Sequence, residues 1–456
     1  MHYDLVIVGT GSGNTILDER FEDWKVAIIE RDVFGGTCLN RGCIPSKMYV
    51  YPADVILELR HLAKLDVDAQ LLGVRWRNMR DRIFGRIDPI AEGGEEWRAS
   101  QPHVDLHRGD ARFVGDKRLE IRCADGSSGV ISGDRIVLAA GARATIPDIP
   151  GLAEVGAHTS DTIMRIDDVP PRLAVIGGGF IAVEQAHVFE AFGSRVTMLV
   201  RGDGLLSHED VDVSNRVTEV SAGRYDLRLR TEVTAARRTP GGIELELVHD
   251  GATSTLEVDE VLVATGRVPN GDQLEVEATG VKLDDLGYVA TDQHLVAADG
   301  IWALGDIRSD MQLKHVANHE ARVVQHNLLH PDDPVPCDER AVPHAVFGHP
   351  QVASVGATQQ ELEASGIPFL VGHRAHGGTA YGWAMEDTTG FVKVLVDPET
   401  GLLLGAHVVG HQAAILLQPL VQAMRFGQTA HEVARGQMWP HPSLAEVVEN
   451  ALLDLR

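Results

Sequence analysis

The stretch that decides the fold is DLVIVGTGSGN, residues 4–14. An apolar strand enters a turn that carries Gly9 and Gly11, and the next apolar strand, VAIIE, ends at Glu30, 21 residues after Gly9. Such glycines let the backbone approach a pyrophosphate at a helix N-terminus, and the distal carboxylate accepts hydrogen bonds from ribose hydroxyls. Asn14 replaces the third glycine of the usual fingerprint. The segment predicts a strand, turn, helix and strand that bind a dinucleotide; an ordinary tight turn is the alternative.

A second segment, residues 173–201, repeats this pattern. Gly177, Gly179 and Ala182 follow the strand LAVI, and the next strand ends at Arg201 instead of an acidic residue. A guanidinium pairs with a 2′-phosphate that a carboxylate would repel. This ending favours NADPH over NADH, and a solvated charge at the strand end is the alternative.

Two such units predict an α/β protein with two Rossmann-like nucleotide-binding domains. Beyond residue 342, alternating strands at 390–397 and 402–410 and helical runs at 413–426 and 446–453 indicate an α+β domain that serves packing, dimerisation or both. The expected boundaries are 1–150 for the first nucleotide domain, 151–272 for the second, 273–342 for a return to the first, and 343–456 for the C-terminal domain.

Composition narrows the function classes. The chain has 66 acidic and 41 basic residues, a formal charge of −25, which argues against a nucleic-acid binder. No uninterrupted apolar stretch of about 18 residues is present, and the N-terminus shows neither a basic region nor a cleavage site. Four cysteines are too few for a disulfide framework, and Cys123 and Cys337 are expected to be isolated thiols. These features predict a cytoplasmic protein with no membrane or nucleic-acid partner.

The strongest chemical signal is GGTCLNRGCIPSK, residues 35–47, which holds Cys38 and Cys43. Five steps of a straight α-helix rise about 7.5 Å, beyond the roughly 7 Å between Cα atoms that a disulfide tolerates. A bond between the two sulfurs therefore needs a distorted turn, which Gly42 permits. We interpret the pair as a redox relay, with coincidental buried thiols as the alternative.

Six segments, in order along the whole chain, resemble the FAD-dependent pyridine nucleotide-disulfide oxidoreductases, the family of glutathione reductase, lipoamide dehydrogenase and mercuric reductase. They are GTGSGN, GGTCLNRGCIPSK, GGGFIAVE, VLVATGRVPN, GIWALGD and a C-terminal WPHP with a following Glu. The resemblance implies a homodimer with FAD and NADPH as cofactors and a redox-active disulfide between Cys38 and Cys43. Cys43 would be the flavin-proximal sulfur, and Cys38 would attack the substrate disulfide.

The same resemblance implies positions for the cofactors. Asp306 would hold the FAD ribitol, Glu30 the adenosine ribose, and Lys47, paired with Glu184, would lie near flavin N5. A helix beginning near Lys314 would point its N-terminus at the flavin pyrimidine ring. The expected cofactor-binding residues are Gly9, Gly11, Gly13, Asn14, Glu30, Thr37, Lys47, Gly141, Gly177, Gly179, Arg201, Gly266 and Asp306.

A C-terminal histidine completes the expected chemistry. By the resemblance, His441 would be the acid/base, supplied by the second subunit, and Glu446 would orient its imidazole. Trp439 stands where the family usually has an additional histidine, and Phe180 replaces a tyrosine that gates the nucleotide site in glutathione reductases.

Several further stretches are similar to the mycothione reductase branch of this family, among them GTGSGNTILDER, FGRIDPIAEGG and AYGWAMEDT. The branch reduces mycothione, a small disulfide. Met48, Tyr49, Tyr51 and residues 76–90 are expected to line the substrate cleft or, as the alternative, to pack in the core. Ser207 stands where NADPH-using relatives often have a second Arg, so NADH is an alternative donor. Other readings are a dihydrolipoyl dehydrogenase, a docked component of a multienzyme complex and an inactive redox-sensing scaffold.

His315 and His319, one helical turn apart in HVANHEA, form a candidate metal pair. The Glu of a metalloprotease signature is missing, because Val316 occupies its place. A flavin-facing helix explains this segment better, so no metal site is predicted.

Overall fold

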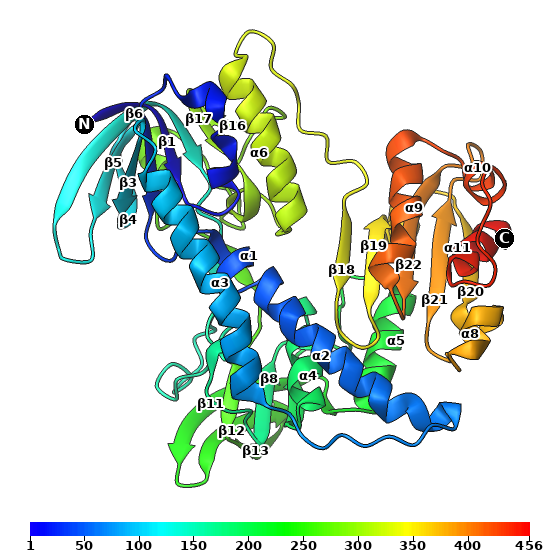
Figure 1. Ribbon diagram of the computed structural model, residues 1–456. Coiled ribbons are helices and arrows are strands. Elements are labelled where there is room, and N and C mark those ends of the chain that lie inside the picture. The colour runs from blue at the N-terminus through cyan, green and yellow to red at the C-terminus, as the bar shows by residue number, and fades with distance from the viewer. The chain divides into compact units, whose positions relative to one another are not determined.

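The computed structural model describes residues 1–456 and divides into two compact units, coloured by residue number in Figure 1. The first unit comprises Met1–Pro45, Asn78–Thr145 and Arg267–Glu339, and the second comprises Ser46–Arg77, Ile146–Gly266 and Arg340–Arg456.

The first unit is built on a mainly parallel sheet. Its strands run in the order β16, β17, β6, β1, β2, β3, with only β16 antiparallel to its neighbour, and a hairpin of β4 and β5 continues from β6. The strands are β1 (His2–Val8), β2 (Val26–Glu30), β3 (Val104–Arg108), β4 (Asp110–Gly115), β5 (Arg118–Arg122), β6 (Ser128–Leu138), β16 (Val296–Ala298) and β17 (Ile301–Ala303).

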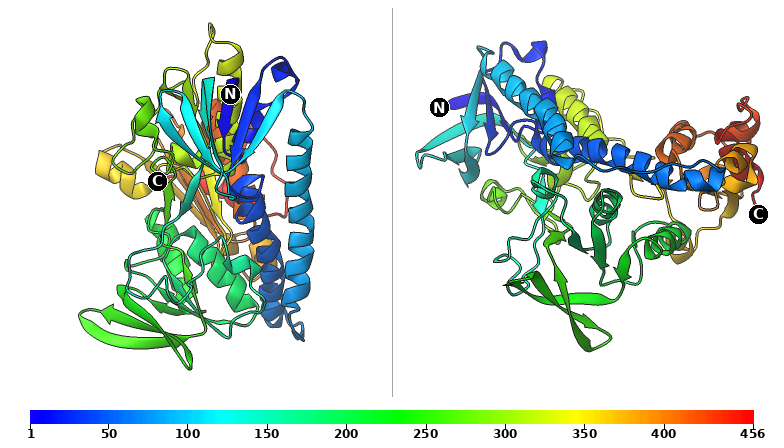
Figure 2. Two further views of the ribbon diagram at one scale, coloured as in Figure 1. Left: turned by 90° about the vertical axis from the view of Figure 1, so that its left-hand side faces the viewer. Right: turned by 60° about the horizontal axis from the view of Figure 1, so that its bottom comes forward.

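Successive residues of β1 alternate between two apolar layers. Leu5 and Ile7 pack with the helix α6 (Lys314–Leu329), whereas Val6 and Val8 pack with the hairpin β4–β5 on the opposite face. A strand buried on both faces is typical of a parallel sheet. The long helix α3 (Trp76–Ala99) is unbroken in both views of Figure 2 although Pro89 lies inside it.

The prediction of an α-helix directly after the first glycine turn is wrong. The chain forms only a short 3₁₀ helix, η1 (Gly13–Ile16), and then a loop. Arg98 of α3 donates hydrogen bonds to the backbone carbonyls of Asn14 and Leu17, and Gln325 of α6 donates to that of Ile16. These carbonyls would otherwise accept the bonds that continue an α-helix.

The second unit contains the other nucleotide-type sheet, in which four parallel strands run in the order β10, β9, β8, β14. They are β8 (Arg172–Ile176), β9 (Arg195–Leu199), β10 (Asp226–Arg228) and β14 (Glu260–Val263). Here the glycine turn does lead into an α-helix, α4 (Phe180–Ala191), and α5 (Val211–Ala222) follows β9. An antiparallel sheet of β11 (Thr231–Thr239), β12 (Gly242–His249) and β13 (Ala252–Val258) packs beside them, and α2 (Cys43–His61) enters this unit.

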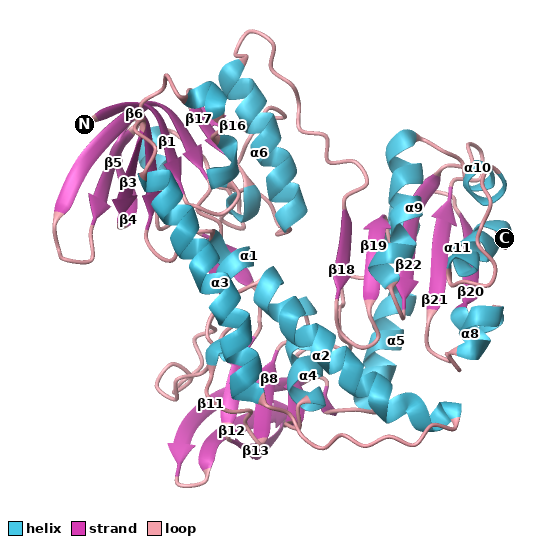
Figure 3. Cartoon of the chain, in the orientation of Figure 1, coloured by secondary structure: helices cyan, strands magenta, loops and turns pink.

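The C-terminal region forms a five-stranded antiparallel sheet in the order β18, β19, β22, β21, β20. The strands are β18 (Pro343–Val346), β19 (Val352–Gly356), β20 (Leu370–Ala375), β21 (Phe391–Val396) and β22 (Leu403–Val409). The helices are α7 (Gln359–Ser365), α8 (Ala380–Ala384), α9 (Ala413–Phe426), α10 (Ala430–Arg435) and α11 (Ala445–Leu453). Figure 3 shows α9 and α11 against one face of this sheet.

The alternation of these strands separates two environments. Ala353, Val392 and Val408 face the helices in one apolar cluster, while the intervening Ser354, Lys393 and His407 face the other way. The predicted fold class, two Rossmann-like regions and a C-terminal α+β domain, is confirmed. The exact domain boundaries stay predictions. No helix combines the length and apolarity that a membrane crossing requires.

Candidate active site

Cys38 and Cys43 lie on either side of a break between two helices. Cys38 is in α1 (Gly36–Asn40), Cys43 is the first residue of α2, and Arg41 between them has φ −151°, outside the helical region. Gly42 is needed here because a Cβ would lie 2.9 Å from the carbonyl oxygen of Thr37. The distorted turn expected from the spacing is therefore present.

Cys43 is exposed and Cys38 is partly buried. A hydrogen bond between the two thiols and burial raise the pKa of Cys38, and the charge of Lys314 opposes the rise. The two thiols are therefore close enough to interact chemically.

The first glycine turn lies next to this cysteine segment. Gly9 has φ +102°, and a Cβ there would lie 2.3 Å from the carbonyl oxygen of Ala139. A Cβ on Gly36 would lie 2.7 Å from Gly11 Cα. Glu30, at the end of β2, accepts hydrogen bonds from the backbone N–H (3.0 Å) and the hydroxyl (2.5 Å) of Thr10. The turn, the carboxylate and the cysteine segment thus form one compact site.

Asp306 and Lys314 belong to the same unit. Asp306 lies in the 3₁₀ helix η6 (Gly305–Ile307), and burial raises its pKa although Arg267 stands 3.8 Å away and opposes the shift. Lys314 starts α6 and donates a hydrogen bond from Nζ to Ser12 Oγ at 2.9 Å. The N-cap Leu313 makes no side-chain hydrogen bond to this helix. The site therefore holds a partly buried carboxylate and a helix N-terminus with positive potential.

In the second unit, Lys47 of α2 and Glu184 of α4 form the expected ion pair. Lys47 Nζ donates to both carboxylate oxygens at 2.7 Å, and only 5% of the Glu184 side chain is exposed. The backbone N–H of Phe347 also donates to Glu184 at 2.9 Å, and the Phe347 ring centroid lies 4.8 Å from Lys47 Nζ. These contacts fix the lysine amine in one position.

The nucleotide turn of the second unit repeats the geometry of the first. Gly177 has φ +131°, and a Cβ there would lie 2.2 Å from the carbonyl oxygen of Ala264. Gly179 is the N-cap of α4, and Arg201 is exposed two residues after the end of β9. The other expected residues are Thr37 in α1, Gly141 with φ +65° after β6 and Gly266 with φ +128° after β14.

His441 and Glu446 are paired as expected. His441 Nδ1 lies 2.8 Å from Glu446 Oε1, and 70% of the histidine side chain is exposed. Glu446, in the first turn of α11, also accepts a hydrogen bond from the backbone N–H of Ser443 at 3.2 Å. The hydrogen bond from His441 lowers the pKa of Glu446. A charged carboxylate thus orients an imidazole that faces outward.

Of the tyrosines expected to line the substrate cleft, one is exposed and the other is packed in the core. Tyr51 is 72% exposed, but Tyr49 is fully buried, donates to the Met164 carbonyl at 2.8 Å and stacks on Trp76 at 4.7 Å. Tyr49 therefore packs in the core and does not line a cleft. The structure contains no group of three or more His, Cys, Asp or Glu side chains placed to hold a metal ion.

Sequence reasoning missed Thr10, Arg98 and Arg267. The sequence signal for Thr10 was a hydroxyl inside the glycine turn, and the signal for Arg267 was its place in the segment VLVATGRVPN. Arg98 had no sequence signal. Arg98 also donates to the side chain of Asn14 at 2.8 Å. Asn14 is thereby fixed by α3.

Comparison with known proteins decides the family. Residues 3–321 match the family model described as pyridine nucleotide-disulphide oxidoreductase, and residues 342–452 match that of its dimerisation domain. The chain belongs to the pyridine nucleotide-disulphide oxidoreductases.

Among curated relatives, mycothione reductase of Mycobacterium tuberculosis is 47% identical over 461 residues, which cover 100% of this chain and 99% of that protein. Dihydrolipoyl dehydrogenase of Haloferax volcanii is 32% identical over 98% of this chain and 96% of its own length. The solved structure of the flavoprotein disulfide reductase RclA from Escherichia coli superposes with a TM-score of 0.85 at 26% identity, covering 99% of both chains.

Family membership confirms the expected oxidoreductase with FAD and NADPH as cofactors, and the dimerisation domain confirms the expected homodimer. The first unit fits FAD. Its glycine turn has no room for a side chain at Gly13, since a Cβ there would lie 2.6 Å from Ala139 Cβ, and Asp306 is a partly buried carboxylate with no closer cation than Arg267. The tight turn and the carboxylates of Glu30 and Asp306 are therefore compatible with a bound FAD.

Proposed function

We propose that this protein reduces mycothione to mycothiol at the expense of NADPH, through a redox-active disulfide between Cys38 and Cys43. The observation that carries the proposal is the 47% identity to mycothione reductase along the whole chain. The cysteine pair supports it, because both thiols lie at one helix break. In total, NADPH, one proton and one disulfide become NADP⁺ and two thiols.

Bound FAD supplies the relay of an electron pair from NADPH to the disulfide. After that relay, Cys38 and Cys43 are a dithiol, and Cys38 attacks one sulfur of the substrate as a thiolate and releases the first thiol product. Cys43 then attacks Cys38, which releases the second product and restores the disulfide. Cys43 begins α2, and a helix N-terminus stabilises a thiolate.

Each product leaves as a thiolate and takes a proton. We assign that proton to His441, supplied by the second subunit of the homodimer, with Glu446 holding the ring in the required orientation. The outward-facing position of His441 suits transfer across a subunit boundary, because 70% of its side chain is open to a partner.

The cofactor roles are proposed residue by residue. Glu30 and Asp306 would accept hydroxyl hydrogen bonds of FAD, and the ion pair of Lys47 and Glu184 would place one amine near flavin N5. Arg201 would pair with the 2′-phosphate of NADPH. The remaining residues would let the backbone approach the phosphates of the two cofactors. They are Gly9, Gly11, Gly13, Asn14, Thr37, Gly141, Gly177, Gly179 and Gly266.

The charge of the chain supports this substrate. A net charge of −25 attracts multiply anionic disulfides poorly, whereas mycothione is a sugar–cyclitol conjugate without such carboxylates. We also propose a cytoplasmic location, where reduced thiols are maintained.

A substrate panel tests the proposal. Steady-state kcat/KM is measured with mycothione, glutathione disulfide and lipoamide, each with NADPH and NADH, and Cys38→Ser serves as the inactive control. Mycothione with NADPH is expected to give the highest value. Preference for lipoamide with NADH would instead assign the chain to the activity named for its Haloferax relative.

A further inference from the structure

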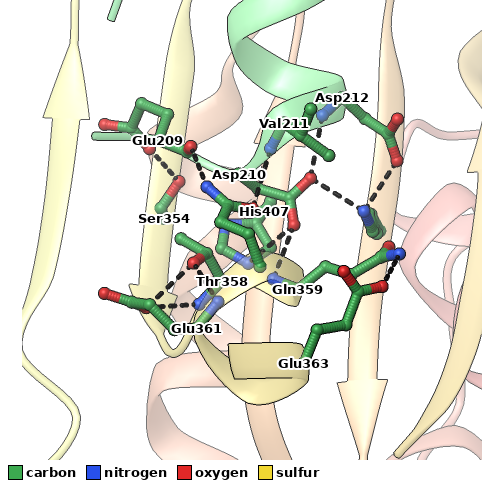
Figure 4. A network of polar contacts seen from close by, with 12 residues as sticks. Glu209, Asp210, Val211, Asp212, Ser354, Thr358, Gln359, Glu361, Glu363 and His407 are labelled. Atoms are coloured by element: carbon green, nitrogen blue, oxygen red, sulfur yellow. Dashed lines mark hydrogen bonds and ion pairs between the residues drawn. The ribbon is translucent and has the colours of Figure 1, made fainter. Parts of the chain in front are cut away.

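A buried polar cluster lies in the second unit, apart from the cysteines and from His441. It joins the start of α5 to the face of the five-stranded sheet that α9 and α11 leave uncovered. We call it the Asp210 cluster and define it as Glu209, Asp210, Asp212, His344, Ser354, Lys393 and His407. Figure 4 shows its carboxylates next to His407 and the N-terminus of α7.

Lys393 and Asp210 form the centre of the cluster. Their side chains are 1% and 0% exposed, and Lys393 Nζ donates to Asp210 at 2.8 Å and to Asp212 at 2.6 Å. The other oxygen of Asp210 accepts a hydrogen bond from the backbone N–H of Gln359 at 3.0 Å. Removing one partner of such a buried pair leaves an uncompensated charge, so the two segments are held strongly in one register.

Glu209 makes a second set of contacts with the same sheet. His344 Nε2 lies 2.6 Å from one carboxylate oxygen, and Ser354 Oγ donates to the other at 2.7 Å. Burial alone would raise the pKa of Glu209, but the hydrogen bond and charge of His344 and the hydrogen bond from Ser354 lower it overall. The side-chain amide of Gln360 also donates to the Glu209 carbonyl at 2.7 Å.

The cluster anchors the end of the loop that begins with Arg201. Between the two, the backbone N–H of Leu206 donates to the carbonyl of Gly178 in the nucleotide turn at 2.8 Å, and that of Leu205 donates to Thr218 Oγ1 at 2.9 Å. Leu206 has φ +51°, a left-handed conformation that a leucine rarely adopts. The loop therefore holds its shape because it is fixed between the glycine turn and the Asp210 cluster.

We propose that the Asp210 cluster positions this loop for recognition of the 2′-phosphate of NADPH, and that Lys393 is the positioning residue at its centre. The C-terminal domain thereby sets the affinity and selectivity for the nucleotide without touching it. This inference rests on the proposed role of Arg201, which begins the loop.

Calorimetric titration of the FAD-loaded protein with adenosine 2′,5′-bisphosphate and with 5′-AMP tests the inference, because only the first ligand carries the 2′-phosphate. In Lys393→Met, binding of the bisphosphate is expected to weaken about tenfold, equivalent to ~1.4 kcal/mol, with less than about a twofold change for 5′-AMP. His344 lies at the exposed rim of the cluster, and His344→Gln is expected to weaken binding of the bisphosphate about threefold.

Arg224→Met is the matched control. Arg224 is a largely buried cation of the nucleotide domain that contains the Arg201 loop. It pairs with Glu190 of α4 and touches neither the loop nor the Asp210 cluster. Arg224→Met is expected to lose about as much thermal stability as Lys393→Met, with no change in the ratio of the affinities for the bisphosphate and 5′-AMP.

The outcomes separate the two assignments. If Arg201→Gln leaves bisphosphate binding unchanged, the proposed role of Arg201 is wrong. If Arg201→Gln weakens it while folded Lys393→Met binds like the parent protein, the positioning role is refuted. Should Lys393→Met fail to fold, His344→Gln and Asp212→Asn decide, and an unchanged affinity ratio in both overturns the inference.

Discussion

Replacing Glu446 by Gln removes the charge that orients His441 but keeps a side chain of similar shape with one acceptor oxygen. The carboxylate lies 2.8 Å from His441 Nδ1 and also accepts the N–H of Ser443. A hydrogen bond to a charged group contributes about 1.5–3 kcal/mol. Because 70% of the histidine side chain is exposed, solvent places this bond at the lower end of that range. About 1.5 kcal/mol corresponds to a roughly tenfold slower proton transfer.

Stopped-flow absorbance separates the two half-reactions of this variant. Reduction of the enzyme by NADPH is expected to proceed at the parental rate, and reoxidation by the disulfide substrate is expected to slow about tenfold. Glu449→Gln is the matched control, because Glu449 lies one turn further along α11 and does not contact His441. Equal slowing in both variants, or slowing of the NADPH step, would refute the orienting role.

Three further predictions concern the relay, the ion pair and acid stability. Cys38→Ser is expected to keep bound flavin and to lose disulfide turnover, with Cys43 left as a lone thiol; full turnover contradicts the relay. Lys47→Met leaves the buried carboxylate of Glu184 unpaired, so NADPH-dependent flavin reduction is expected to slow at least tenfold; an unchanged rate removes Lys47 from the site. Burial lowers the pKa of His349 from 6.5 to about 3, so the unfolded chain binds the proton first and stability falls as the pH drops below 6.5. Denaturant titration is expected to show about 2 kcal/mol lost between pH 6.5 and 5, and His349→Phe is expected to flatten that slope; an identical slope excludes this histidine.

Local chemistry made much of the site predictable. Gly9 and Gly177 were predicted from the glycine fingerprint after an apolar strand, and the structure adds a steric reason, because a Cβ at either position would overlap a backbone carbonyl oxygen. Cys38 and Cys43 were predicted with Gly42 between them because a straight helix cannot bring such a spacing together. His441 and Glu446 needed the family resemblance, since an exposed histidine has no distinguishing pattern of its own.

Contacts between distant segments were not predictable. The expected helix after Gly13 is missing because Arg98, 84 residues after Asn14, donates hydrogen bonds to the backbone carbonyls of Asn14 and Leu17. Tyr49 looked like a cleft residue from its place after Lys47, yet it is buried against Trp76. The missing helix and the burial of Tyr49 both depend on where the helix α3, distant in the sequence, packs.

The sequence alone determined the repeated strand and glycine turn, the cysteine spacing and the alternating C-terminal strands, because each is set by sterics or periodicity within a few residues. Only the tertiary structure decided that Lys393 meets Asp210, a partner 183 residues away, on the uncovered face of a sheet. The physical reason is that burial of a charge depends on which surfaces come together, and no local pattern records that.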